Sequence, residues 1–78
     1  MSFMFELYYP KPADKEREDK IISNVSAAGG HLDYRETTDE PNGSICLTFE
    51  FENEEKAELA ATALRESGEH VEGVCTYE

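Results

Sequence analysis

The chain has 78 residues, with 18 acidic side chains against 7 Lys and Arg, which gives a net charge of −11 at pH 7. This length predicts one domain over residues 1–78, and a hydrophobic content of 38 % is too high for a disordered acidic tail. The acidic balance argues against binding of a nucleic-acid backbone, and no apolar run approaches the ~20 residues that a membrane helix requires.

The first two elements are predicted from the spacing of their apolar residues. Residues 3–9 are rich in aromatic side chains and alternate with period two, which predicts a strand that ends at Pro10-Lys11-Pro12. Residues 13–28 then show apolar side chains at helical spacing. Gly29-Gly30 predicts the end of this helix, because glycine accepts the left-handed conformation of a C-cap.

A pair of strands joined by a turn is predicted next. Residues 31–37 alternate and indicate a strand with Leu32 and Tyr34 facing inward. Residues 39–43 form a turn, since its Asn-Gly pair tolerates positive φ. Residues 45–51 alternate most clearly and indicate another strand.

The C-terminal part predicts a second helix and a last strand. Asn53 is a favourable N-cap, followed by a helix with a stripe of small apolar residues that ends at Gly68. Val71 to Tyr77 is expected to be one strand, with its alternation blurred by Gly73.

The predicted element order is therefore β-α-β-β-α-β, which belongs to the α+β class. Right-handed crossovers favour a ferredoxin-like sandwich, with four antiparallel strands in the order 4-1-3-2 and two helices on one face of the sheet. The other face of the sheet is expected to stay uncovered.

The residues predict no catalytic centre, no cofactor and no metal site. The two histidines, His31 and His70, begin strands that run in opposite directions, so they are expected at opposite ends of the sheet and cannot share a general-base site. Cys46 and Cys75 have no CxxC companion, and no histidine pair has ligand spacing.

The uncovered sheet face offers a poor platform for RNA. Strands one and three are expected to present one aromatic residue beside two carboxylates, which repel phosphate. The same face is a candidate surface for pairing of two copies, as a homodimer. The moderately polar side chains expected there are Met4, Tyr8, Cys46 and Thr48.

The acidic charge is concentrated in the second half of the chain, because residues 36–78 contain twelve acids and two bases. Strand directions in the predicted fold bring several of these acids to one end of the domain, together with His31. A basic protein partner is expected to dock there, with the charges mainly raising its association rate. The predicted partner-binding residues are Glu50, Glu52, Glu54, Glu55 and Glu78.

The cysteines are predicted to be free thiols. Strands three and four flank strand one, so their axes lie about 9.6 Å apart, whereas a disulfide needs Cα atoms within about 7 Å. Alternation places Cys75 inward and Cys46 outward, which makes Cys46 the more reactive thiol. Two cysteines without a basic secretory start indicate a cytoplasmic protein.

Three segments of the second half of the chain resemble the regulator of ribonuclease E activity, B type. They are Ser44–Phe49, the helix Glu54–Glu66 and the closing Val71–Glu78. That family ends its domain on an acidic-Gly-Trp-Gly-Thr-Tyr-like stretch, which Glu72, Gly73, Thr76 and Tyr77 match. Val74 and Cys75 stand in place of the Trp and Gly, and the family's acidic tail and N-terminal helical extension are absent. The resemblance implies a small, acidic, non-catalytic protein that acts by binding a larger enzyme.

The sequence therefore predicts a regulatory protein that binds a protein partner and has no catalysis of its own. The alternative is an ACT-like module that binds a small ligand at a dimer interface. ACT-like domains share the topology, but Pro10-Lys11-Pro12 occupies the position of their usual glycine-containing loop.

Overall fold

The computed structural model describes residues 1–77. The elements follow the order β1 (Ser2–Pro10), α1 (Lys15–Ala27), β2 (His31–Thr37), β3 (Ser44–Phe51), α2 (Glu54–Glu66), β4 (His70–Val71) and β5 (Cys75–Tyr77). All strand pairs are antiparallel, and the sheet order is β2-β3-β1-β4, with β5 also paired to β1. The predicted ferredoxin-like α+β fold is confirmed.

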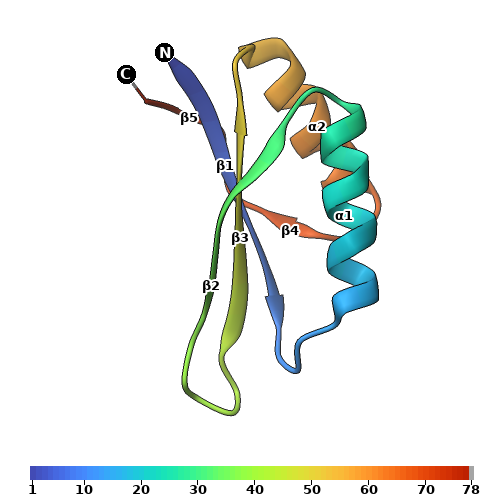
Figure 1. The fold of residues 1–78 in the computed structure, drawn as a ribbon, viewed down its shortest axis with the longest axis vertical. Helices are drawn as coiled ribbons and strands as arrows, with labels where there is room; N and C mark the ends of the chain where they lie inside the picture. The colour runs from blue at the N-terminus through green and yellow to red at the C-terminus, as the bar shows by residue number, and fades with distance from the viewer. Residues whose placement is uncertain (78) are drawn as a thin grey trace.

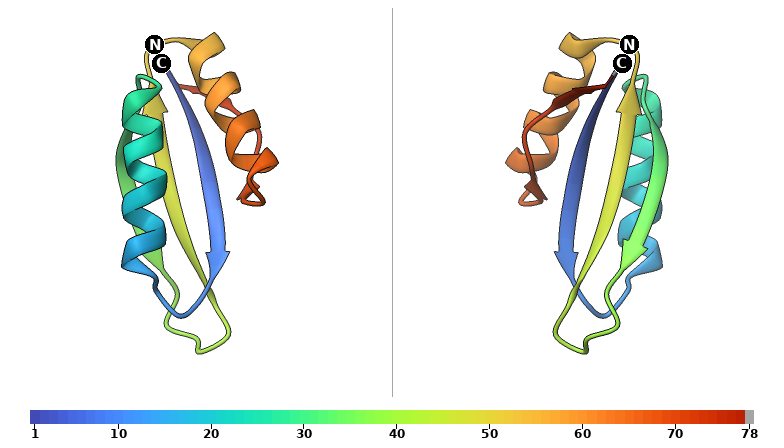
Figure 2. Two further views of the ribbon diagram at one scale, coloured as in Figure 1. Left: turned by 90° about the vertical axis from the view of Figure 1, so that its right-hand side faces the viewer. Right: turned by 90° about the vertical axis from the view of Figure 1, so that its left-hand side faces the viewer.

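Both helices pack on the same face of the sheet, as Figures 1 and 2 show. The core lies between the two layers and is centred on the aromatic and aliphatic side chains of β1 and β3. Phe5 stacks on Phe51 with ring centroids 5.7 Å apart, and Leu7, Ile45, Leu47 and Ala57 are fully buried beneath the helices. No helix of residues 1–77 covers the far side of the sheet.

The ends of the helices follow the capping signals in the sequence. Asp14 and Asn53 cap α1 and α2, each accepting a hydrogen bond from the backbone N–H three residues later. Gly29 and Gly68 follow the helices with φ of 99° and 97°, a conformation that favours glycine. The backbone N–H of Gly30 donates to the Val25 carbonyl at 3.0 Å and closes the first of these caps.

The last strand differs from the prediction, because it is divided into two short pieces on the edge of β1. β4 pairs its residues His70 and Val71 with Tyr8 and Leu7, and β5 pairs with the start of β1. Between them, the backbone N–H of Glu72 donates to the Glu6 carbonyl at 2.9 Å. The break moves β5 to a different phase from the one predicted for a continuous strand.

The prediction that Tyr34 faces inward is also wrong. A β-bulge interrupts the pairing of β2 with β3 between Leu32 and Tyr34, and leaves Asp33 without a partner opposite it. Leu32 still packs against the core, but Tyr34 is 59 % exposed on the far side of the sheet. Arg35 takes the inward position beyond the bulge.

The turn between β2 and β3 lies where it was predicted but uses different geometry. Neither Asn42 nor Gly43 has a positive φ, and the turn is closed by a hydrogen bond of 3.0 Å from the Gly43 N–H to the Glu40 carbonyl. Gly43 is required for space, since a Cβ there would collide with the Thr38 side chain.

No helix among residues 1–77 is long and apolar enough to cross a membrane.

Candidate functional site

The candidate site is the face of the sheet that the helices leave uncovered, here called the open face; the right-hand view of Figure 2 looks onto it. Directly opposed residues of antiparallel strands share a face. Since Phe5, Leu7 and Phe49 point into the core, their neighbours along the strands point to the open face. Register then assigns to it Met4, Glu6, Tyr8, His31, Tyr34, Glu36, Cys46, Thr48, Glu50, His70, Cys75 and Tyr77.

The structure places the four predicted open-face residues together. Three successive pairs of β1 and β3 share this face. Tyr8 lies opposite Cys46, Glu6 lies opposite Thr48, and Met4 belongs to the next pair. The Cys46 thiol donates to the Glu6 carboxylate at 3.6 Å and lies 3.9 Å from the Thr48 hydroxyl. These contacts form a polar centre in the middle of the open face.

The side chains at this centre are shielded enough from solvent to shift their pKa values. Burial, with smaller contributions from Cys46 and Glu6, raises the pKa of Tyr8 to about 12. Burial likewise raises the pKa of the Cys46 thiol. Both groups are therefore protonated at neutral pH and act as hydrogen-bonding groups, so this centre holds no activated nucleophile.

The basic side chains, unlike the acidic ones, are absent from the strand positions of the open face. The strand positions on the open face carry the acids Glu6, Glu36 and Glu50 and no Lys or Arg. Each of the seven bases lies on a helix, in the connection from β1 to α1, or on the helix side of the sheet. Together with Tyr8, Tyr34 and the half-exposed Tyr77, this face is acidic and aromatic.

The predicted acidic end adjoins the open face. Glu50 is at the end of β3, Glu52 follows it, and Glu54 and Glu55 occupy the first turn of α2, at the top of Figure 1. Three of them are exposed and Glu50 is partly buried. His31 lies at the same end, as predicted, with Nε2 3.1 Å from Glu50 Oε1. Glu78 lies outside the described residues.

The two histidines lie toward opposite ends of the sheet, as predicted, and also on different edges. His31 is on β2 and pairs with Glu50, whereas His70 is on β4 and pairs with Tyr8. The His70 ring tilts against Tyr8 with a centroid distance of 6.2 Å. They cannot act on one substrate atom. His31 does, however, lie beside Asp33 and Glu50, a grouping of potential metal ligands that sequence spacing did not reveal.

On the helix side, sequence analysis missed a buried polar network centred on Glu18. The Arg35 guanidinium donates two hydrogen bonds to the Glu18 carboxylate, from Nε to Oε1 at 2.6 Å and from Nη2 to Oε2 at 2.9 Å. The Tyr9 hydroxyl also donates a hydrogen bond to this carboxylate. The Arg35 hydrogen bonds hold the pKa of Glu18 below its usual range. The Tyr9 hydroxyl accepts from the Asp14 N–H at 3.0 Å, and the Arg17 guanidinium lies 4.8 Å from the Tyr9 ring centre.

This network joins β1, α1 and β2 and leaves its groups satisfied, so its role is to hold the scaffold. A signal for it was present in the sequence. Glu18 precedes Ile21 by three residues and Val25 by seven, which places it on the inner stripe of α1. The run of seven charged residues around it concealed this position.

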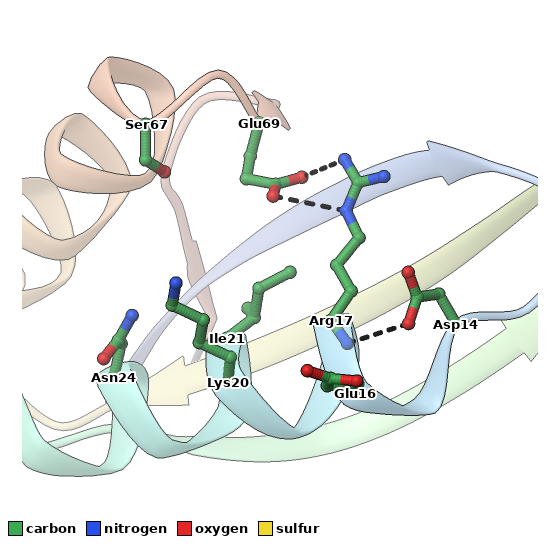
Figure 3. Close-up of a pocket in the computed structure, with 8 residues that line it drawn as sticks. All are labelled: Asp14, Glu16, Arg17, Lys20, Ile21, Asn24, Ser67 and Glu69. Carbon is green, nitrogen blue, oxygen red and sulfur yellow. Dashed lines mark hydrogen bonds and ion pairs between the residues drawn. The ribbon is translucent and has the colours of Figure 1, made fainter.

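An open groove of about 480 Å³ lies between α1 and the end of α2, and its lining residues are drawn in Figure 3. Arg17 spans it and pairs with Glu69 through two hydrogen bonds of 2.7 and 3.3 Å. Its walls mix Asp14, Glu16 and Glu69 with Arg17 and Lys20, so they present no consistent charge to a ligand. The groove therefore lacks the apolar, converging walls of a small-molecule site.

The two cysteines are free thiols, as predicted, but their exposure is the reverse of the prediction. Cys75 was expected to face inward and is exposed on β5, because the break before β5 changes the phase of the strand. Cys46 points to the open face but is only 8 % exposed. Since burial also raises its pKa, we expect Cys75 rather than Cys46 to be the more reactive thiol.

No family model and no curated protein matches this chain. Among solved structures, the chain is similar to a de novo designed protein, Foldit4, with a TM-score of 0.68 over 100 % of both chains and 15 % sequence identity. Similarity at this level concerns the fold alone. It supports the ferredoxin-like architecture and assigns no activity.

Proposed function

We propose that this protein is a non-catalytic regulator that binds a basic surface of a larger protein through the open face and the acidic end beside it. The observation that carries this proposal is that the strand positions of the open face hold acids but no bases. The open face bears Glu6, Glu36 and Glu50 without a Lys or Arg at its strand positions, while the bases lie on the helices, on the helix side of the sheet or in the connection from β1 to α1. Such a face attracts a positively charged partner and repels nucleic acid.

The aromatic residues of the open face support the same proposal. Tyr34 and Tyr77 are 59 % and 51 % exposed, and Tyr8 lies on the same face, partly buried. Tyrosine supplies a large contact area at a small entropic cost and is enriched at the energetic centres of protein interfaces. Carboxylates around such residues provide the steering and the polar rim.

The same charges disfavour the homodimer that the sequence allowed. Pairing two open faces would bring Glu6, Glu36 and Glu50 against the same acidic face of a second copy, and like charges brought together at an interface cost free energy. Sedimentation velocity at low salt is expected to show a monomer. A dimer would assign this face to self-association.

The resemblance of the C-terminal strand to regulators of ribonuclease E supports the class of partner proposed. Those proteins act by binding a larger enzyme, so purified ribonuclease E is the first enzyme to test. A cytoplasmic location is part of the proposal, in agreement with two free thiols.

The decisive experiment compares matched charge variants in capture assays with ribonuclease E and with lysate from the source organism. The double variant Glu50→Gln, Glu52→Gln removes two acids from the proposed surface. The control, Glu58→Gln with Glu66→Gln, removes two exposed acids from α2. We expect the first pair to weaken capture at low salt and the control to leave it unchanged, with equal or slightly higher melting temperatures for both.

A third variant, Tyr8→Ala, separates the two parts of the surface. If only this variant weakens capture, the partner sits on the open face and the acidic end serves solubility. Equal effects of both charge pairs would contradict a localised surface. The alternative ACT-like function predicts instead that a small ligand such as an amino acid raises the melting temperature.

A further inference from the structure

Three side chains with metal-binding atoms meet at the edge of the open face where β2 begins. They are His31 and Asp33 of β2 and Glu50 at the end of β3, and their ligand atoms all lie within 4.8 Å of one another. We propose that these three residues bind a zinc ion. This site does not depend on the proposed partner.

The backbone of β2 produces this arrangement. His31 lies directly opposite Glu50, so the two side chains share the open face. Asp33 is two residues further along and is the unpaired residue of the β-bulge, which changes the direction of a side chain relative to a regular ladder. The same irregularity that exposes Tyr34 therefore brings a second carboxylate beside the histidine.

The distances suit a small tetrahedral ion. Zinc binds histidine nitrogen and carboxylate oxygen at about 2.0–2.2 Å, which places two tetrahedral ligands roughly 3.3 Å apart. His31 Nε2 and Glu50 Oε1 are 3.1 Å apart. The remaining separations, none above 4.8 Å, can close by rotation of exposed side chains, since Asp33 and His31 are both exposed.

The donor atoms indicate the class of metal. Zinc and related first-row ions accept imidazole nitrogen beside carboxylate oxygen, whereas magnesium and calcium prefer oxygen ligands alone. Two carboxylates with a neutral imidazole also balance the charge of a divalent cation. Asp33 has no ion pair with a Lys or Arg among residues 1–77, and Glu50 pairs only with His31 there.

The exposure of these side chains determines which coordination position of the zinc ion stays open to water. The His31 side chain is 63 % exposed and that of Glu50 is 26 % exposed, so a fourth position on the metal is open to water. The second histidine offers an internal comparison. His70 Nε2 lies 3.7 Å from Glu72 Oε2, and no third ligand is grouped with this pair in the described part of the chain.

The test is a titration of the full chain with ZnCl₂, followed by calorimetry and by NMR of the two histidine rings. A Cys75→Ser background removes the exposed thiol as a competing ligand. Loss of a partner that merely orients a metal ligand costs roughly 10–100-fold in affinity. We therefore expect Asp33→Asn and Glu50→Gln each to weaken zinc binding at least tenfold.

The matched control is Glu72→Gln, which removes the carboxylate beside His70 and leaves zinc affinity unchanged. Zinc is expected to shift the ring resonances of His31 before those of His70, and magnesium to shift neither. Equal shifts of both histidines, or equal losses from Asp33→Asn and Glu72→Gln, would show only general attraction of cations to an acidic surface. Either result would overturn the proposal, as would a His31 ring that does not respond to zinc.

Discussion

Among residues 1–77, Glu18 is the one charged side chain that is buried, and it is 6 % exposed. Glu18→Gln keeps its shape but removes the charge that Arg35 and Tyr9 contact. Because hydrogen bonds to a charged group contribute roughly 1.5–3 kcal/mol, we expect the free energy of unfolding in urea to fall by about that amount. Asp19→Asn, at an exposed ion pair with Lys15 on the same helix, is expected to change it by less than ~0.5 kcal/mol. Equal losses would contradict a structural role for burial of Glu18.

Glu18 also makes a prediction about pH. Arg35 lowers the pKa of this carboxyl in the folded state below its ordinary value of 4.5. A lowered pKa stabilises the folded protein fully above the unfolded value, and this stabilisation is lost as pH falls through the folded value. The difference in free energy of unfolding between wild type and Glu18→Gln is therefore expected to be constant near neutral pH and to shrink below pH 4.5. A difference that grows in acid would mean that the folded pKa is raised.

The cysteines allow a further test at the scale of residues. Cys75 is exposed, whereas Cys46 is buried, which also raises its pKa. Iodoacetamide is therefore expected to modify Cys75 first in the folded protein, since the thiolate is the reactive form. Mass spectrometry of peptides after a short reaction measures the order, and in urea the two rates should converge. Faster modification of Cys46 in native buffer would show that the centre of the open face is accessible.

At the scale of elements, the N-cap of α2 can be tested on its own. The Asn53 side chain accepts the Lys56 N–H at 2.9 Å. Asn53→Ala removes this acceptor and is expected to lower the free energy of unfolding by about 1 kcal/mol, measured by denaturation. Asn53→Asp retains an acceptor oxygen, so it should be close to wild type. If both variants lose the same amount, the amide group has a role beyond capping.

Capping residues and clean alternation made most elements predictable, whereas local irregularities did not. Asn53 begins α2 and Gly68 ends it, as their residue types predict. The bulge at Asp33 has no compositional signature, yet it reverses the orientation of Tyr34 and creates the grouping with His31. A sequence that alternates by type therefore predicts the strand and its pairing, but the face of each residue beyond a bulge depends on the register that the partner strand imposes.

At the scale of the whole molecule, the charge that shapes the proposed binding surface also opposes folding. The net charge is −11, and the acids of residues 36–78 outnumber the bases by ten. Repulsion among them is long-ranged, whereas ion pairs such as those of Arg35 with Glu18 and Arg17 with Glu69 act at contact distances and are partly shielded from salt. Moderate salt should therefore remove more repulsion than attraction.

The melting temperature is accordingly expected to rise when NaCl is increased from about 0.01 M, where the screening length is ~30 Å, to about 0.15 M, where it is ~8 Å. Thermal denaturation followed by circular dichroism measures this shift. The double variant Glu50→Gln, Glu52→Gln carries two fewer negative charges, so its melting temperature should start higher at low salt and rise less. A melting temperature that falls with salt would mean that the ion pairs outweigh the general repulsion. In that case the excess of acidic side chains would impose no cost on folding, and it would need no balancing advantage in binding.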